Sequence, residues 1–343
     1  MILEIGPRAY VARAYAADTA FFPTGFDEVP EGVRVLGSLA ALSRALARPD
    51  LELIVCHPGF SSPWGARHLS RSIVSRKFLQ GRSSLFRAFG PELLRGTTRP
   101  LVVIDHEDLP VISRSNLFLL DRCRLWFKRE LPADHWRVFL KTAHANLPTP
   151  RFRETPRHRA RMEKLRPISI GLPLGAEPLL PGAPAEKIAD VFFAGAVEGS
   201  STVRARGLAE LTALAAQGVL VDIPAAPLPR ADFYRRCAAA WLVWSPEGLG
   251  WDCFRHYEAP ACGAVALINQ PPIDRHAPLL GGEHALYYDP EPGGLTRAVR
   301  AALADKDALA RIAAAGRAHV LAHHTPAALA RHVVETALAL KTG

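Results

Sequence analysis

The residues with the clearest potential for chemistry follow one predicted strand in the second half of the chain. After the apolar stretch 240–245, a short turn leads to Asp252, Arg255 and Glu258. Asp252 is a candidate N-cap, which would place Arg255 in the first turn of a helix and Glu258 on the same face. An arginine beside free helical N–H groups is a candidate diphosphate site, and a carboxylate can accept hydrogen bonds from a ribose diol. The alternative is an exposed Arg255–Glu258 pair that contributes a few tenths of a kcal/mol, and the spacing alone favours neither.

A second turn with suitable residues follows the predicted strand 190–194. Gly195 permits close backbone approach, and Ser200, Ser201 and Thr202 can cap the next helix. Arg204 or Arg206 can reach phosphate oxygens. Ligands of open parallel sheets bind at the carboxyl ends of strands, so we expect both turns on one edge of a sheet. The chain has neither a Walker A lysine motif nor a GxGxxG motif, so the sequence supports neither NTP hydrolysis nor dinucleotide redox chemistry.

The elements that must position these residues alternate between short apolar strands and helical patterns. Strands are predicted at residues 51–56, 101–105, 125–128, 190–194, 219–223, 240–245, 264–269 and 285–288. Helices are predicted at residues 36–48, 203–216, 230–239, 252–262, 294–304, 306–321 and 326–340. This alternation is typical of α/β proteins with parallel, doubly wound sheets. Residues 171–187 are rich in proline and glycine and are predicted as a linker between two Rossmann-like domains.

The segment from Ser245 to Ile268, SPEGLGWDCFRHYEAPACGAVALI, resembles the donor-site segment of exostosin-like glycosyltransferases. It is also similar to the related spore-protein-type family in the glycosyl transferases group 1 superfamily. The shared elements are Ser245-Pro246, Gly248, Gly250, Asp252-Cys253, Arg255, Glu258-Ala259 and Gly263. Pro260 and Ala266 depart from the pattern, but neither change removes a polar group. The resemblance covers the second half of the chain well and the first half poorly.

This resemblance implies the GT-B architecture, in which two facing Rossmann-like domains each contain a parallel, doubly wound sheet. The second domain would hold a nucleotide-sugar as donor substrate, with Glu258 on the ribose and Arg255 on the diphosphate. The resemblance also implies metal-independent transfer, since arginines and helix ends would neutralise the leaving diphosphate. We therefore expect no metal site, although residues 105–108 (DHED) contain carboxylates spaced like a metal-binding DxD motif.

Candidate bases for an acceptor hydroxyl lie at strand ends in the first half of the chain. His57 follows the strand 51–56, and Asp105 and Asp108 come at and after the end of the strand 101–105. If the sugar is transferred with inversion, an imidazole or carboxylate could remove the acceptor proton. Asp105 and His57 are the first candidates and Asp108 is the third. The alternative for each of them is a residue that caps the turn after its strand.

The net positive charge of the chain comes from its first half. The 343 residues include 42 Lys and Arg against 33 Asp and Glu; residues 1–172 carry a net charge of +11 and residues 173–343 carry −2. Residues 67–99 place seven Arg and one Lys among apolar side chains. Such a segment suits peripheral contact with an anionic membrane surface, or with an anionic or lipid-linked acceptor. The alternative is a solvated helical face in an arginine-rich chain.

Composition excludes several classes of protein. A chain that is 49% apolar and 22% charged is not intrinsically disordered. No apolar run reaches the roughly 18 residues of a spanning helix, and Glu4 and Arg8 interrupt any signal peptide. The five cysteines form no CxxC pair, and we predict that they are core residues in a reducing compartment. We therefore expect a cytoplasmic protein, either free or peripheral to the inner face of the membrane.

Taken together, these observations predict a glycosyltransferase that moves a sugar from a nucleotide-sugar to an acceptor. Residues 1–172 would form the acceptor domain, residues 173–325 the donor domain, and residues 326–343 a helix that packs back towards the first domain. One alternative is a nucleotide-sugar epimerase or hydrolase of the same fold. Another is a basic protein that binds nucleic acid or an anionic surface, although no motif supports a nucleic-acid partner and none is expected.

Overall fold

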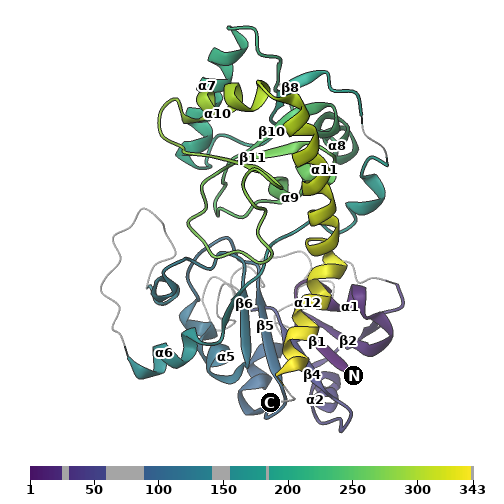
Figure 1. The fold of residues 1–343 in the computed structure, drawn as a ribbon. Coiled ribbons are helices and arrows are strands. Elements are labelled where there is room, and N and C mark those ends of the chain that lie inside the picture. Colours follow the sequence, from purple (N-terminus) through teal and green to yellow (C-terminus); the bar gives the residue numbers. More distant parts are fainter. Residues whose placement is uncertain (25–30, 59–88, 141–154, 183–184, 341–343) are drawn as a thin grey trace. The chain divides into compact units, whose positions relative to one another are not determined.

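The computed structural model describes residues 1–24, 31–58, 89–140, 155–182 and 185–340. The chain forms two compact units, one made of residues 1–168 with 329–343 and the other of residues 169–328 (Figure 1). Each unit contains one parallel β-sheet with helices packed against it. The predicted α/β class with parallel, doubly wound sheets is therefore confirmed.

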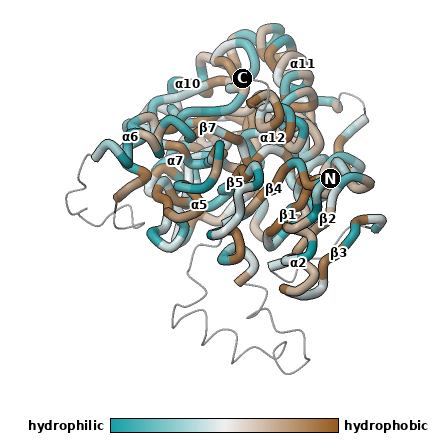
Figure 2. Tube along the Cα trace, turned by 90° about the horizontal axis from the view of Figure 1, so that it is seen from below, coloured by the Kyte–Doolittle hydropathy of each residue, from teal (hydrophilic) through white to brown (hydrophobic). Residues whose placement is uncertain are grey.

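The sheet of the first unit has seven strands in the order β3-β2-β1-β4-β5-β6-β7, and all neighbouring pairs are parallel. The strands are β1 (Ile2–Gly6), β2 (Thr19–Pro23), β3 (Arg34–Val35), β4 (Leu53–Cys56), β5 (Leu101–Asp105), β6 (Leu125–Lys128) and β7 (Leu165–Pro167). The central strands are almost wholly apolar because both of their faces are buried, as is usual in parallel sheets. Figure 2 shows the hydrophobic residues along β1 and β4.

Helices cover the two faces of this sheet. They are α1 (Val11–Ala14), α2 (Leu39–Leu46), α5 (Leu117–Arg122), α6 (Pro156–Met162) and the C-terminal part of α12 (Pro326–Ala339). Leu42 and Leu119 pack with one set of alternating strand residues, and Val11 and Val333 pack with the other set. The last helix of the chain is thus part of the core of the first unit.

The sheet of the second unit has five parallel strands in the order β12-β11-β10-β8-β9. The strands are β8 (Ala189–Phe192), β9 (Val221–Asp222), β10 (Ala240–Ser245), β11 (Val265–Asn269) and β12 (Leu286–Tyr288). The helices are α7 (Thr202–Ala215), α8 (Arg230–Ala238), α9 (Phe254–Ala261), α10 (Gly294–Leu303) and α11 (Lys306–His323). The turns after β8 and β10 therefore both lie at the carboxyl edge of one sheet, since these two strands are parallel neighbours.

Several predicted elements differ from those observed. The predicted strand 219–223 is reduced to two residues, because β9 is an edge strand and Leu220 before it is 61% exposed. Strands β1, β2, β3 and β7 were not predicted from the sequence. The predicted linker 171–187 is wrong for its first part, because Leu172 and Ala176 are buried in the core of the second unit.

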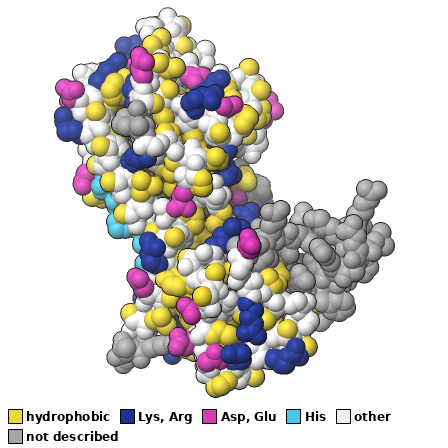
Figure 3. All heavy atoms as spheres, turned by 90° about the vertical axis from the view of Figure 1, so that its right-hand side faces the viewer, with side chains coloured by type: hydrophobic (Ala, Val, Ile, Leu, Met, Phe, Trp, Pro, Cys, Tyr) yellow, Lys and Arg dark blue, Asp and Glu magenta, His cyan; other side chains and the backbone are white. Residues whose placement is uncertain are grey.

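Two predictions about surfaces can be compared with the structure only over the described residues. Of the basic segment 67–99, residues 67–88 lie outside them, and residues 90–96 form a short 3-10 helix. Among the helices that the structure describes, none is long and apolar enough to cross a membrane. On the face shown in Figure 3, positive and negative side chains are interspersed with hydrophobic ones.

Candidate functional site: paired arginines at a sheet edge

Arg255 is the central charged residue at the carboxyl edge of the second sheet. It lies in the first turn of α9, and its Nη2 donates to the carbonyl oxygen of Ala194 at 2.8 Å. Its guanidinium lies 5.0 Å from the ring centroid of Phe193. Within the described part of the chain, its Nε and Nη1 are buried and have no hydrogen-bond partner. Burial, together with the neighbouring charge of Arg204, lowers the pKa of Arg255.

Arg204 connects the two turns of this edge. It lies in the first turn of α7 and is 9% exposed. Its Nε donates to the carbonyl oxygen of Glu247 at 2.8 Å, after β10, and its Nη1 donates to that of Ala196 at 2.7 Å, after β8. Two arginines therefore share one edge, and both use backbone carbonyls as acceptors. Positive charge that carbonyl dipoles only partly offset favours an anionic ligand.

Two glycines provide the space that the arginines occupy. A Cβ at Gly195 would clash with Nη2 of Arg255, and a Cβ at Gly248 would lie 2.9 Å from Nη2 of Arg204. Gly195 was predicted to permit close approach of a ligand at this turn, and that role stays a prediction. Here the group that approaches the glycine is a protein guanidinium.

Glu258 lies one turn further along α9 and is 9% exposed. Its Oε1 accepts a hydrogen bond from the hydroxyl of Tyr234 at 3.0 Å. The pKa of Glu258 is raised, because the effect of burial exceeds the opposing effects of the Tyr234 hydrogen bond and the charge of Arg255. The alternative of an exposed Arg255–Glu258 pair is wrong, because Glu258 is 9% exposed and Nε and Nη1 of Arg255 are buried, and the described residues include no salt bridge between the two.

The predicted N-cap role of Asp252 is wrong. Cys253 is the N-cap of α9, and Asp252 turns away from the helix N-terminus to satisfy other donors. Its Oδ2 accepts from the backbone N–H of Ile170 at 2.6 Å, and its Oδ1 accepts from the hydroxyl of Tyr257 at 2.6 Å. Asp252 therefore anchors the start of the second unit to α9.

Ser245 and Gly250 take part in hydrogen bonds of the turn between β10 and α9. The Ser245 hydroxyl is buried and lies 2.6 Å from Nδ1 of His256, whose Nε2 lies 2.7 Å from the carbonyl oxygen of Trp251. The carbonyl oxygen of Gly250 accepts from the N–H of Gly248 at 2.8 Å, which closes the turn. These contacts hold the backbone between β10 and α9 in one conformation.

Two other predicted residues lie at the margin of the site. Arg206 is exposed and its Nη1 donates to the carbonyl oxygen of Pro290 at 3.4 Å, so the structure does not bring it to Arg255. Ser200 is half-buried in the turn before α7, where its N–H donates to the carbonyl oxygen of Val197 at 3.3 Å. The N-cap of α7 is Ser201, whose hydroxyl makes no cap hydrogen bond. Its hydroxyl instead lies 3.3 Å from the carbonyl oxygen of Glu247.

Sequence reasoning missed Asn269, which fixes Glu247 in the same turn. The buried Asn269 side chain accepts from the N–H of Glu247 at 2.9 Å and donates to its Oε2 at 3.0 Å. The available signal was a polar residue at the carboxyl end of the predicted strand 264–269. Asn269 thereby holds the carbonyl group of Glu247 where Arg204 can reach it.

At the carboxyl edge of the first sheet, His57 is paired with a carboxylate that was not predicted. Nε2 of His57 lies 2.8 Å from Oε1 of Glu4 in β1, and both side chains are buried. Glu4 also accepts hydrogen bonds from three backbone N–H groups at the start of α1, those of residues 10–12. The His57 ring packs against Gly6, where a Cβ would lie 2.6 Å from its Cδ2. His57 is therefore held in one orientation.

Asp105 and Asp108 are engaged in ion pairs. Oδ2 of Asp105 accepts from Nζ of the fully buried Lys128 and from Nε1 of Trp126, both at 3.1 Å. Its Oδ1 accepts from the N–H of Glu107 at 3.1 Å, so both oxygens of Asp105 are already engaged and this geometry disfavours it as a proton acceptor. Asp108 is half-exposed and lies 2.6 Å from Nη1 of Arg129. In the described part of the chain, no group of three or more His, Cys, Asp or Glu side chains could hold a metal ion.

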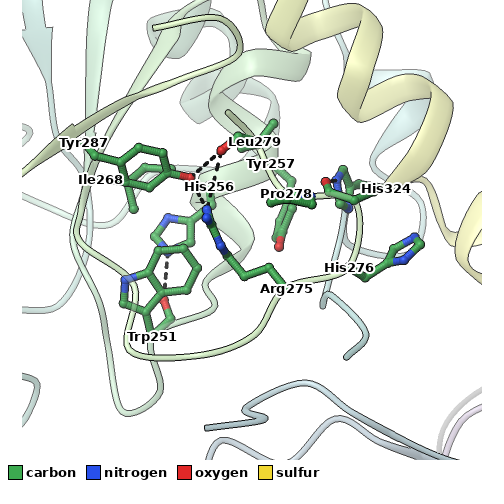
Figure 4. Close-up of a pocket in the computed structure, with 11 residues that line it drawn as sticks. Trp251, His256, Tyr257, Ile268, Arg275, His276, Pro278, Leu279, Tyr287 and His324 are labelled. Atoms are coloured by element: carbon green, nitrogen blue, oxygen red, sulfur yellow. Dashed lines mark hydrogen bonds between the residues drawn. The ribbon is translucent and has the colours of Figure 1, made fainter. Parts of the chain in front are cut away.

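A small pocket in the second unit lies beside Trp251, and its lining is shown in Figure 4. Arg275 lines it, and its guanidinium carbon lies 5.6 Å from the ring centroid of Trp251 and 5.3 Å from that of Tyr287. Arg275 also donates to the Tyr287 hydroxyl. Nε2 of His324, another lining residue, bonds the carbonyl oxygen of Ala277 at 2.9 Å. We assign no ligand to this pocket, because Arg275 and His324 already make hydrogen bonds within the protein.

The comparisons with known proteins point to one class. Residues 227–335 match the model of a family described as glycosyl transferase-like. This region includes the turn after β10, all of α9, and Glu258. No curated protein matches the chain.

Solved structures resemble the chain over nearly its whole length. A UDP-forming α,α-trehalose-phosphate synthase from Burkholderia xenovorans is 12% identical, with a TM-score of 0.58 and 98% of both chains covered. A glycosyltransferase from Rickettsia africae ESF-5 is 8% identical, with a TM-score of 0.55 and 98% and 97% covered. Sucrose-phosphate synthase from Thermosynechococcus elongatus is 13% identical, with a TM-score of 0.52 and 100% and 99% covered.

At these identities the similarity establishes the fold. The predicted GT-B fold is confirmed, and residues 227–335 match a glycosyl transferase-like family model. The finer assignment to exostosin-like enzymes stays a prediction.

Proposed function

We propose that this protein is a glycosyltransferase that transfers a sugar from a nucleoside-diphosphate sugar without a metal ion. The observation that carries the proposal is the pair Arg204 and Arg255. Two guanidinium nitrogens of Arg255 are buried and unsatisfied among the described residues, at a helix start beside a second arginine. An unsatisfied buried cation is unfavourable in the free protein, and a diphosphate would supply the missing acceptors.

The same charges would drive the reaction. As the bond between the sugar and the diphosphate breaks, negative charge grows on the leaving group. Arg255 and Arg204, which are already held by backbone carbonyls, would stabilise that charge with little reorganisation. Glu258 would bind the ribose diol, since one carboxylate can accept several hydrogen bonds besides that of Tyr234.

UDP is the first nucleotide to test. A similar structure is described as UDP-forming, and another is an α-glucosyltransferase in complex with UDP, with a TM-score of 0.55 and 8% identity. If transfer inverts the anomeric centre, we assign the base to His57, because Glu4 orients its imidazole while Asp105 is held by Lys128. An anionic or lipid-linked acceptor and contact with the inner face of the membrane remain predictions from residues 67–99.

Isothermal titration with UDP, GDP and ADP tests the proposal on the wild type, Glu258→Ala and Arg206→Ala. We expect one nucleotide to bind the wild type and Arg206→Ala equally, because Arg206 lies away from the site. Glu258→Ala should weaken binding about tenfold to 100-fold, as expected for lost hydrogen bonds to a charged group. At about 100 times Kd, the nucleotide should stabilise the wild type by about 2.7 kcal/mol.

Two outcomes would contradict the proposal. Binding of anionic vesicles or polyanions in a salt-dependent way, with no nucleotide bound, would favour the basic binding protein. Consumption of the nucleotide-sugar at equal rates with and without any acceptor would favour the hydrolase or epimerase.

A further inference from the structure

Cys253 differs from the other cysteines of the chain. All five lie within the described residues, and only Cys253 is partly exposed; the buried ones are Cys56, Cys123, Cys237 and Cys262. Burial raises the pKa of Cys123 to about 12 and also raises the pKa of Cys56 and Cys237. Those thiols stay protonated at neutral pH and are poor nucleophiles.

The surroundings of Cys253 are positive. It is the N-cap of α9, so the positive end of the helix dipole is directed at it. Its Sγ lies 4.0 Å from Nη2 of Arg204 and 3.8 Å from the carbonyl oxygen of Gly250. A second, independent observation is the buried guanidinium of Arg255, two residues on, whose Nε and Nη1 lack partners in the described part of the chain.

These features resemble those of reactive thiols in other proteins. A helix N-terminus and neighbouring arginines favour the thiolate, which is the nucleophilic form of cysteine. A positive site also concentrates anionic reagents. The thiol contacts Arg204 and precedes Arg255 by two residues, so it lies beside the groups to which we assign the diphosphate.

We propose that Cys253 is a modification site, at which thiol-directed electrophiles and hydroperoxides react and thereby exclude the nucleotide diphosphate. This rests on the proposed function, because the excluded ligand is the donor. With hydrogen peroxide, the thiolate sulfur attacks one oxygen, the O–O bond breaks and an S–O bond forms. The sulfur is oxidised to a sulfenic acid, and the departing hydroxide takes a proton to become water. With iodoacetate, an S–C bond forms and iodide leaves.

The test uses the whole wild-type protein, so that it does not depend on whether a variant folds. Iodoacetate and iodoacetamide are added at pH 7 in separate reactions, and the label is mapped by mass spectrometry. We expect Cys253 to be labelled first. Its preference for iodoacetate over iodoacetamide should exceed that of N-acetylcysteine about tenfold, as expected for an anion near two arginines, and should shrink in high salt. Saturating UDP should slow the labelling at least about tenfold if less than a tenth of the sites remain free.

Variants identify the labelled thiol. Cys253→Ser should lose the fast label, whereas the matched variant Cys237→Ser should keep it. Hydrogen peroxide followed by a sulfenic-acid probe should mark the same residue. Labelling spread over the buried cysteines, or a reagent preference equal to that of N-acetylcysteine, would overturn the proposal.

The outcomes for this proposal and for the proposed function can be distinguished. If calorimetry shows that UDP binds but labelling keeps its rate, the modification site is overturned and the transferase proposal stands. If GDP or ADP binds in place of UDP, that nucleotide is used for protection; if none of the three binds, the donor assignment is lost and inorganic pyrophosphate becomes the probe. Protection by pyrophosphate then supports an anion site at Cys253, and unchanged labelling overturns it.

Discussion

Buried charged side chains are compensated in different ways at the carboxyl edges of the two sheets. In the first unit, opposite charges meet, as in the pair of Asp105 with Lys128. Glu4 is likewise held by His57 and by the N–H groups that begin α1. In the second unit, Arg204 and Arg255 bond backbone carbonyls, and neither forms a salt bridge among the described residues.

This difference separates charged groups that stabilise the fold from charged groups that would bind a ligand. A neutralised pair is stable in the free protein, and removing one member leaves the other buried and uncompensated. Two like charges on one edge repel each other and disfavour the free protein, so a bound anion should stabilise it. The comparison therefore assigns a structural role to the Asp105–Lys128 pair and a binding role to the two arginines.

The largest effect should come from Lys128→Met. It leaves the Asp105 carboxylate buried without its cation, so we expect the free energy of unfolding to fall by about 3–5 kcal/mol. Urea unfolding at pH 7 measures the loss. Lys164→Met is the control, because Lys164 is only part-buried and bonds two carbonyl oxygens. An equal loss in both variants would show that the ion pair has no special structural role.

Arg255→Met should lower the affinity for the nucleoside diphosphate about 100-fold, through the loss of charge-assisted hydrogen bonds. The melting temperature of the free protein should not fall, because the substitution removes a buried charge that burial and Arg204 disfavour. Calorimetric titration and thermal unfolding are measured together, with Arg206→Met as the exposed control. A large drop in melting temperature with affinity retained would reverse the roles that the comparison assigns.

Gly195→Ala should weaken nucleotide binding about tenfold, about 1.4 kcal/mol, because the new Cβ displaces the Arg255 guanidinium. The matched variant is Gly182→Ala, where a Cβ meets nothing within 4 Å. Both proteins are titrated with the same nucleotide at one salt concentration. Equal affinities would mean that the guanidinium position in the free protein is not the one that binds.

The smallest effect concerns a charged cluster of the first unit away from the sheet edge. Partial burial raises the pKa of Asp121, but hydrogen bonds from Arg161 and Arg157 outweigh it and bring the pKa to about 2. Because the folded pKa is depressed, this stabilisation is fully present above the unfolded pKa of about 3.9 and is lost as the pH falls towards 2.

We therefore expect Asp121→Asn to cost about 1 kcal/mol at pH 7, since solvent screens this partly exposed cluster. Urea unfolding of wild type and variant at pH 7 and pH 2.5 measures the difference. The difference in the free energy of unfolding between wild type and variant should be smaller at pH 2.5 than at pH 7. A larger difference at pH 2.5 would show that the charge of Asp121 is not the source of the stabilisation.

The elements of the second unit and the last helix of the chain were largely predictable because each one carries its own signal. β10 and β11 are apolar runs buried on both faces, and the helix after residue 325 begins with a cap in which Oγ1 of Thr325 accepts from the N–H of Ala328 at 3.1 Å. β1 was missed because Glu4 interrupts its apolar run. That glutamate is tolerated only because the start of α1 and His57 satisfy it, and neither contact is visible in local sequence.

The sequence alone determined the types of the groups at the proposed donor site and the order in which they follow the strands. Arg255 and Glu258 were recoverable because helical spacing and strand ends are local properties. Only the tertiary structure decided how each charge is used. It paired Asp105 with Lys128, directed Asp252 to Ile170 and placed Arg206 at the surface. It also left Arg255 partly unsatisfied among the residues that the structure describes. The physical reason is that hydrogen bonding and burial depend on partners distant in the chain, which spacing does not specify.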